Sequence, residues 1–359
     1  MKNEANEGLL VYNQYLHRKR IALVIVVIAT MLVAIYSIGI GSISISIKDI
    51  VKVFLGSGDK MHTTAVMNIR LPRAVTAIVV GAALAAAGAV MQCVLRNPLA
   101  SASSLGVSQG AAFGAALGIV VFGGGVVNSA NATTAITISN PYIVTLCAFV
   151  FGIVSTVVIV GISQFKKNVG PGGLILAGTA LSSLFSGAST ILQYFADDTK
   201  LGAIVFWTFG NLGSTSWNEI AILSAVFALA MIYFMFNRWN YNAMESGADT
   251  AKSLGVNTRS VMLLSMAICS LLAAVAVSFV GIISFVGLVA PHIMRRFVGN
   301  DYRYLVPSSA IAGALLLLMA DIVSRIVMAP VILPIGALTA FLGAPIFLYL
   351  LFKGGKKNG

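Results

Sequence analysis

Long apolar runs without a single charged residue dominate this sequence. The first run, residues 21–40, contains no Asp, Glu, Lys or Arg. About 20 such residues in a helix cross a hydrocarbon core ~30 Å thick. The runs are continuously apolar, whereas the strands of a membrane β-barrel alternate apolar and polar residues. The pattern therefore predicts an all-α, polytopic membrane protein.

Composition favours the same class. Hydrophobic residues make up 58% of the 359 residues and charged residues only 9%, whereas soluble domains average about 25% charged residues. So few charges could not cover a water-facing surface of this size. Basic residues at 18–20 precede the first run, and no small-residue cleavage site follows it. We therefore expect an uncleaved first helix rather than a signal peptide.

Ten transmembrane spans are expected along the chain. The eighth is short and follows the seventh almost without a loop, which predicts a broken or partly re-entrant helix. The expected spans are 20–40, 73–94, 104–122, 141–163, 172–195, 218–236, 259–281, 282–296, 304–327 and 333–352. They form one transmembrane domain, 20–352, between an N-terminal segment, 1–19, and a Lys- and Gly-rich tail, 353–359, for which we expect disorder.

The basic residues predict the orientation of the spans, because cytoplasmic loops carry an excess of Lys and Arg. With the N-terminus inside, sixteen of the 23 Lys and Arg lie on the inner side and seven on the outer side. The inner set is Lys2, Arg18, Lys19, Arg20, Arg96, Lys166, Lys167, Arg238, Lys252, Arg259, Arg295, Arg296, Arg303, Lys353, Lys356 and Lys357. The outer set is Lys48, Lys52, Lys60, Arg70, Arg73, Lys200 and Arg325. Both termini are therefore expected in the cytoplasm, and the net charge of +12 is explained by an anionic leaflet rather than by nucleic acid.

Residues that usually carry chemistry are sparse. The sequence has neither a GxxxxGK[ST] phosphate loop nor a Ser/His/Asp constellation, so catalysis and ATP hydrolysis by this chain are not expected. Cys93, Cys147 and Cys269 lie far apart in apolar runs, which predicts packing residues rather than a metal or redox site. No cofactor is expected. Glu219 and Asp321 lie toward helix ends, whereas an ion-coupled carrier more often needs a carboxylate at mid-depth.

Arginines on the expected outer side are candidates for binding a carboxylate. Arg70 and Arg73 place two guanidinium groups three residues apart, and guanidinium suits bidentate carboxylate pairing. Asp321 and Arg325 are four residues apart on one helix face, which allows an ion pair within the helix. Arg325 could instead snorkel at the membrane rim or meet an external acidic partner.

Small residues and breaks mark three further segments. The small residues of 81–92 predict close helix packing, and Gln92 could form a hydrogen bond across helices. Pro98 disfavours helical geometry at Asn97, which predicts either a simple turn or a break that faces a cavity. The inner segment 237–258 is helix-compatible but has glycines at 247 and 255, which predicts short helices with breaks.

Several ordered motifs resemble the permeases of iron-chelate and vitamin B12 ABC importers. They extend from about residue 65 to the C-terminus, and their order makes the set far more specific than any one of them. The motifs are Arg70-Leu-Pro-Arg73, Gly81-Ala-Ala-Leu84, Gly88-Ala-Val-Met-Gln92, Arg96-Asn-Pro-Leu-Ala100, Leu105-Gly-Val-Ser108, Ala251-Lys-Ser-Leu-Gly-Val256, Phe285-Val-Gly-Leu-Val-Ala-Pro-His-Ile-Met-Arg295, Ala320-Asp-Ile-Val-Ser-Arg325, Leu333-Pro-Ile-Gly336 and Leu342-Gly-Ala-Pro-Ile-Phe347. The resemblance implies an ABC type II importer permease fold in the inner membrane of a prokaryotic cell.

The resemblance also implies partners and cargo. A permease of this family forms a homodimer or heterodimer around a central pathway, with two ATPase subunits on the inner side and an extracytoplasmic binding protein on the outer side. The expected cargo is a ferric siderophore, with haem, cobalamin or an oxyanion as alternatives. Two readings outside the family are an ion-coupled secondary transporter and a membrane scaffold without transport activity.

Three sets of site residues follow from the resemblance. Docking of the binding protein is assigned to Arg70, Arg73 and Arg325. Coupling to the ATPases is assigned to Asp249, Ala251, Leu254 and Gly255, within a coupling segment at about 240–257. A cytoplasmic gate is assigned to Asn97, Leu99, Pro171 and Gly172. Ala248 departs from the pattern, since an acidic residue is common there.

Overall fold

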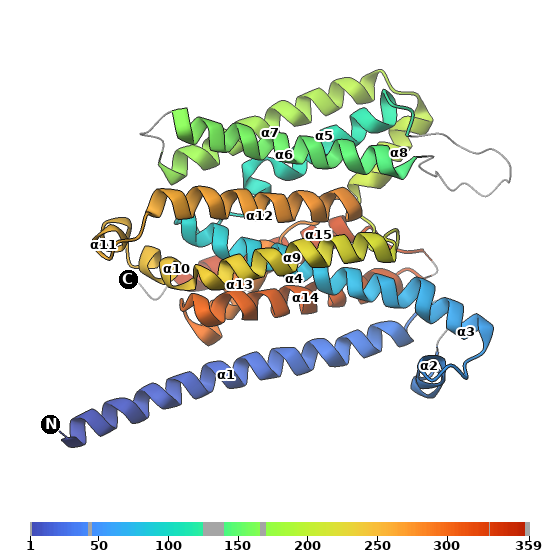
Figure 1. The fold of residues 1–359 in the computed structure, drawn as a ribbon. Coiled ribbons are helices and arrows are strands. Elements are labelled where there is room, and N and C mark those ends of the chain that lie inside the picture. The colour runs from blue at the N-terminus through green and yellow to red at the C-terminus, as the bar shows by residue number, and fades with distance from the viewer. Residues whose placement is uncertain (1, 42–44, 125–139, 166–169, 330, 356–359) are drawn as a thin grey trace.

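The computed structural model describes residues 2–41, 45–124, 140–165, 170–329 and 331–355, and every regular element within these ranges is a helix. The long helices run side by side and form a bundle with two ends (Figure 1). One end carries α11 (Ala248–Ser253) and the other carries α3 (Lys60–Thr64). They are called the α11 end and the α3 end below.

The remaining helices follow the chain back and forth between these ends. They are α1 (Lys2–Gly39), α2 (Ile47–Phe54), η1 (Ala65–Arg70), α4 (Leu71–Val94), η2 (Ala102–Leu105), α5 (Val107–Val120), α6 (Pro141–Phe165), α7 (Pro171–Tyr194), α8 (Asp198–Thr208), α9 (Trp217–Phe236), α10 (Arg238–Glu245), α12 (Thr258–Val280), α13 (Val286–Val298), α14 (Tyr302–Ile326) and α15 (Ile335–Gly355). Each of the ten expected spans coincides with one of these helices.

Seven of the described helices are long and apolar enough to cross a membrane. The expected spans at 104–122 and 333–352 correspond to shorter apolar helices, α5 and the first part of α15. The expected span at 282–296 corresponds to α13, whose 13 residues extend only about 20 Å. The prediction of an all-helical membrane fold is confirmed, while ten full crossings stay a prediction.

The break expected at the eighth span lies just before α13. Residues 281–285 are not helical, and Phe285 has a left-handed φ of 65°. Other chain segments enclose this stretch: the Asn211 amide donates to the carbonyl of Val280, and a Cβ atom at Gly336 would overlap the carbonyl of Ile282. Irregular backbone at membrane depth is tolerated where protein surrounds it.

α4 is the central helix, and most of its residues are buried. A Cβ atom at Gly81 would overlap the carbonyl of Gly313 in α14, and one at Gly88 would overlap the carbonyl of Gly287 in α13. The predicted close packing through small residues is therefore confirmed. Gln92 is buried, but its side-chain amide has no hydrogen-bond partner among the described residues, so the expected bond across helices is not formed.

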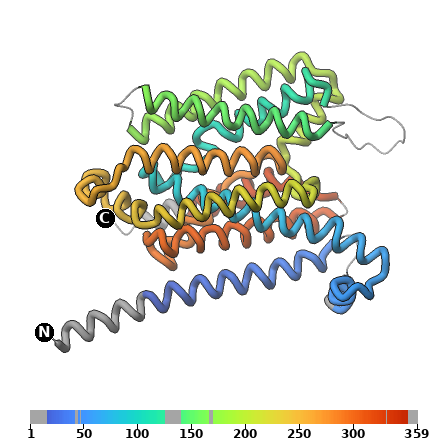
Figure 2. Tube along the Cα trace, in the orientation of Figure 1, coloured from blue at the N-terminus to red at the C-terminus, as the bar shows by residue number. Residues whose placement is uncertain are grey.

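The segments outside the bundle are also helical. The segment 237–258 forms α10 and α11 with breaks at Gly247 and Gly255, whose φ angles are 120° and 82°, as the sequence predicts. The tail departs from its prediction, since α15 continues to Gly355; positions 356–359 lie outside the described residues. α1 runs unbroken from Lys2 along the edge of the bundle (Figure 2), so no structural boundary marks residue 20.

The ends of the bundle separate the charged segments as the topology predicts. The turn after α4, the helices α10 and α11, and the turn between α13 and α14 share the α11 end. The helices α2, α3 and α8 share the α3 end (Figure 1). Lys166, Lys167, Lys356 and Lys357 lie outside the described residues. The location of the α11 end in the cytoplasm stays a prediction.

Candidate functional site

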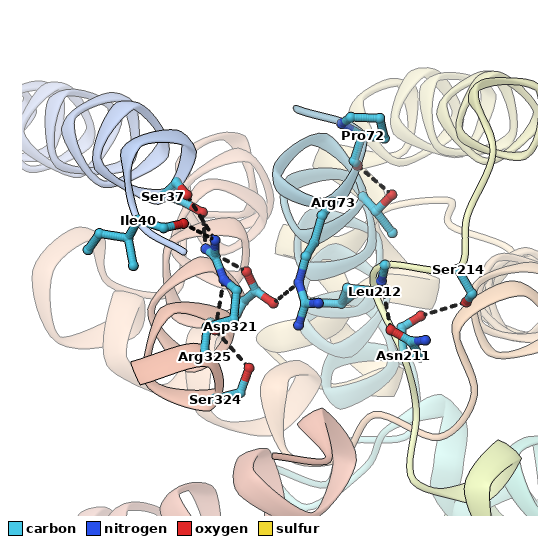
Figure 3. A network of polar contacts seen from close by, with 12 residues as sticks. Ser37, Ile40, Pro72, Arg73, Asn211, Leu212, Ser214, Asp321, Ser324 and Arg325 are labelled. Atoms are coloured by element: carbon cyan, nitrogen blue, oxygen red, sulfur yellow. Dashed lines mark hydrogen bonds and ion pairs between the residues drawn. The ribbon is translucent and has the colours of Figure 1, made fainter. Parts of the chain in front are cut away.

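Two of the predicted docking arginines meet at one buried carboxylate near the α3 end (Figure 3). Arg73 Nε of α4 donates a hydrogen bond of 2.7 Å to Asp321 Oδ1 of α14. Arg325 Nη2 lies 2.9 Å from Asp321 Oδ2, close enough for an ion pair but not aligned for a hydrogen bond. Asp321 is fully buried. The predicted ion pair within α14 is confirmed, and Arg73 is a second, long-range partner.

The last turn of α1 binds the same cluster. Arg325 Nη1 donates to the carbonyls of Ser37 and Ile40 at 3.0 and 2.8 Å, and its Nη2 donates to the Ser37 hydroxyl at 2.6 Å (Figure 3). Arg70 Nη1 donates to the carbonyls of Ile38 and Gly39 at 3.0 and 2.9 Å. Carbonyls at a helix C-terminus lack partners within the helix and attract cations.

The three docking arginines line one hollow of ≈ 280 Å³, together with His62. The sequence predicts exposed guanidinium groups, but Arg70 and Arg73 are each only 8% exposed. That expectation is wrong for this conformation, because Asp321 and the carbonyls of α1 attract the arginines inward. The sequence correctly groups the three arginines; their role in docking stays a prediction.

A loop between α8 and α9 covers Arg73 from the other side. Leu212 of this loop is fully buried against the core, and the hydroxyls of Thr76 and Thr215 lie 2.6 Å apart. Asn211 Oδ1 accepts a hydrogen bond from the amide of Gly213 at 2.8 Å, which closes the turn. Sequence reasoning missed this loop, since its contact with α4 joins residues separated by 139 positions.

The predicted gate residues come together at the α11 end. A hollow of ≈ 480 Å³ is lined by Asn97 after α4 and by Pro171 and Gly172 at the start of α7. Asn97 breaks the helix as Pro98 predicts, and its Oδ1 accepts a hydrogen bond of 2.8 Å from the amide of Leu99. Leu99 is 47% exposed and lies outside this lining. The side chains thus support both the turn and the cavity reading, while gating itself stays a prediction.

The predicted coupling residues differ in their exposure. The side chain of Asp249 is fully exposed and lies 3.4 Å from Lys252, and Leu254 is 68% exposed. No atom lies within 4 Å of a Cβ atom built at Gly255. Ala251 is fully buried, so its methyl group packs inside and does not offer a partner contact in this conformation. The exposed residues form a surface that a cytoplasmic partner could reach.

The structure adds no candidate for chemistry. Among the described residues, no group of three or more His, Cys, Asp and Glu is placed to hold a metal ion. All three cysteines are free thiols, with Cys93 and Cys269 buried and Cys147 half-buried. His292 packs against the ring of Phe347 with 6.2 Å between ring centroids, as expected for a packing residue. The site is therefore a set of contact surfaces.

Comparisons with known proteins cover nearly the whole chain. The FecCD transport family matches residues 28–353. A Methanocaldococcus jannaschii protein described as an ABC transporter permease is 48% identical over 96% of this chain and 98% of its own length. A hemin transport system permease of Yersinia pestis is 34% identical over 93% of this chain and 96% of its own. An Fe(3+)-citrate import system permease of Bacillus subtilis is 35% identical over 95% of this chain and 98% of its own.

A solved structure agrees with the fold. It is described as an inward-facing conformation of a metal-chelate type ABC transporter. It superposes with a TM-score of 0.80 at 32% identity and covers 92% of this chain and 98% of its own. The arrangement of helices in Figure 1 is therefore one that an importer permease adopts.

Proposed function

The chain belongs to the FecCD transport family of ABC importer permeases, and from this premise we propose that it forms half of a dimeric pathway for a ferric siderophore or related metal chelate. In this proposal two ATPase subunits bind the α11 end in the cytoplasm, and a binding protein delivers the chelate at the α3 end. The permease supplies no chemistry. It supplies two states with different access, between which the ATPases drive it.

The observation that carries the proposal is the position of two contact surfaces at opposite ends of one bundle. The α11 end exposes Leu254 and the open backbone at Gly255, which suit insertion into a groove of an ATPase. The α3 end holds the arginine hollow, whose described lining includes three guanidinium groups and no acidic residue. An importer must meet its energy source on one side and its cargo carrier on the other.

The arginine hollow suits a partner with surface carboxylates. Guanidinium groups recognise carboxylates through two parallel hydrogen bonds, and complementary charge speeds association. We therefore expect Arg70→Gln to weaken binding of the binding protein by roughly tenfold, or about 1.4 kcal/mol. Titration in nanodiscs at low and high salt measures this. Lys48→Gln, an exposed change at the same end, is the control, and equal losses in both variants would remove the docking role.

Metal chelates are the cargo class that the relatives favour. One relative is named for hemin and another for Fe(3+)-citrate. Ferric siderophore is the proposed cargo because such systems are common, and haem, cobalamin and oxyanions are the alternatives within the family. An ion-coupled secondary transporter remains the alternative of another class.

The proposal is tested with the permease, its ATPases and its binding protein in proteoliposomes. Uptake of a ferric hydroxamate is measured with ATP inside and no ion gradient, beside haem and cobalamin. We expect uptake that requires ATP and saturates with one chelate class. Uptake that follows a proton or sodium gradient without the ATPases would overturn the proposal.

A further inference from the structure

Side chains outside the three predicted sets hold the coupling segment to the start of α14. Asn242 of α10 accepts a hydrogen bond of 2.8 Å from the amide of Tyr302 and donates one of 3.2 Å to Asp301 Oδ1. Glu245, three residues later, accepts a hydrogen bond of 2.8 Å from Asn300 Nδ2. Residues three apart lie on one helix face, so one face of α10 holds the whole turn before α14.

The hydroxyl of Tyr302 lies at the centre of this contact. It donates to Glu245 Oε2 at 3.1 Å and accepts from Arg295 Nη2, near the end of α13, at 3.2 Å. Tyr302 is fully buried, and hydrogen bonds to charged groups are stronger than neutral ones. We call Asn242, Glu245 and Tyr302 the α10–α14 clamp. It joins α10 to α14 and, through Arg295, to α13.

A second layer of contacts surrounds the clamp. Asp301 pairs with Arg303 at 2.7 Å and with Lys19 of α1 at 3.5 Å. The guanidinium of Arg303 lies 4.7 Å from the ring centroid of Trp239 in α10, which adds a cation–π contact between α14 and α10. The start of α14 is therefore tied to α10 from two sides.

α10 is also anchored in the bundle. Tyr241 is fully buried, its hydroxyl lies 2.9 Å from that of Ser265 in α12, and its ring centroid lies 5.9 Å from that of Tyr302. Leu254, beyond α11, is exposed instead. The coupling segment thus has one side fixed in the bundle and another available to a partner.

α14 connects this clamp with the arginine hollow. It runs as one helix from Tyr302 to Ile326, about 37 Å, and carries Asp321 near its far end. A Cβ atom at Gly313 would overlap the carbonyl of Gly81, so α14 and α4 touch through their backbones. Such close packing makes independent sliding of the two helices unfavourable.

We propose that Asn242 and Glu245 are positioning residues for energy coupling, an inference that depends on the proposed function. They transmit displacement of the coupling segment to α14, and α14 transmits it to Asp321 and the arginine hollow. Neither residue has to touch an ATPase subunit. With the clamp cut, closure of the ATPases moves α11 without an equal movement of α14, and ATP is hydrolysed without transport.

The test compares cargo transported per ATP hydrolysed in proteoliposomes that contain the complete importer. Glu245→Gln is the informative variant, because the carboxylate accepts from two donors and an amide has only one acceptor oxygen. We expect cargo per ATP to fall roughly tenfold, with basal ATP hydrolysis and assembly unchanged. Asn242→Ala should act in the same way, and Asn300→Ala, which removes only one contact, should have a smaller effect.

Glu219→Gln is the matched control, since Glu219 caps α9 at the opposite end and Gln can replace it there. If the unmodified importer transports and Glu245→Gln keeps the same cargo per ATP, the inference is overturned. A Glu245→Gln variant that loses its ATPases on size-exclusion chromatography would show a purely structural role and would also overturn it. An unmodified importer that does not transport contradicts the proposed function instead.

Discussion

Among single residues, Asp321 has the largest influence on the arginine cluster. Its buried carboxylate is the counter-ion of both Arg73 and Arg325. Asp321→Asn keeps the shape but leaves two guanidinium groups without negative charge, and loss of one partner from a buried ion pair costs about 3 kcal/mol. We expect a lower thermal unfolding temperature in detergent. Asp198→Asn, an exposed change at the start of α8, should leave this temperature unchanged; equal shifts would contradict the prediction.

Asp301 predicts a pH dependence at the α11 end. Burial alone would raise its pKa, but hydrogen bonds from Arg303 and Asn242 outweigh burial and lower the pKa from 3.8 to about 2. A lowered pKa in the folded state gives stability that is present above the unfolded pKa and is lost as the pH falls through the folded pKa.

The measurement is the difference in unfolding temperature between the unmodified protein and Asp301→Asn. We expect this difference to be constant above pH 5 or so and to shrink between pH 3.8 and about 2. A difference that grows as the pH falls through this window would show that the carboxylate is not stabilised in its charged form.

Residue types were easier to predict than their partners. The pair Asp321 and Arg325 lies on one helix, so its spacing alone predicts the contact. The contacts of Arg73 with Asp321 and of Asn242 with Tyr302 join residues 248 and 60 positions apart. No local pattern encodes such contacts, and the burial of the arginines follows from them. The sequence therefore predicts which arginines group together but not their inward orientation.

Among the helices, α4 depends most on close backbone contact. Gly88→Ala would place a methyl group against the carbonyl of Gly287, a backbone atom that cannot rotate away. Overpacking of this kind costs about 1–3 kcal/mol, so we expect less folded protein and a lower unfolding temperature. In α6, a Cβ atom at Gly161 meets no atom within 4 Å. Gly161→Ala is the matched control and should not destabilise; similar losses in both would argue against the contact.

Long helices follow directly from apolar runs, and shorter elements do not. The expected spans at 73–94 and 304–327 match α4 and α14 closely, because hydropathy alone defines them. α13 is less defined by its own sequence, since its start depends on the backbone of 207–211 and 335–336 packing against 281–285. Hydropathy cannot report a stretch whose peptide groups are satisfied by distant segments.

For the whole molecule, the central prediction is its orientation in the membrane. In a background without native cysteines, Ser253→Cys at the α11 end and Lys200→Cys at the α3 end report the two sides. We expect a membrane-impermeant maleimide to label Lys200→Cys in intact cells and Ser253→Cys only after permeabilisation, because the basic loops are retained inside. Labelling of Ser253→Cys in intact cells would reverse the topology and exclude contact with cytoplasmic ATPases.

The contacts of α1 have a consequence for how the protein is made. Lys19 pairs with Asp301, 282 positions later, and the carbonyl of Ser37 accepts from Arg325, 288 positions later. α1 leaves the ribosome first, yet the side chains that fix its two ends are synthesised near the end of translation. The edge helix is thus the last to be secured, and a nascent chain that stops before residue 325 leaves its final carbonyls uncapped.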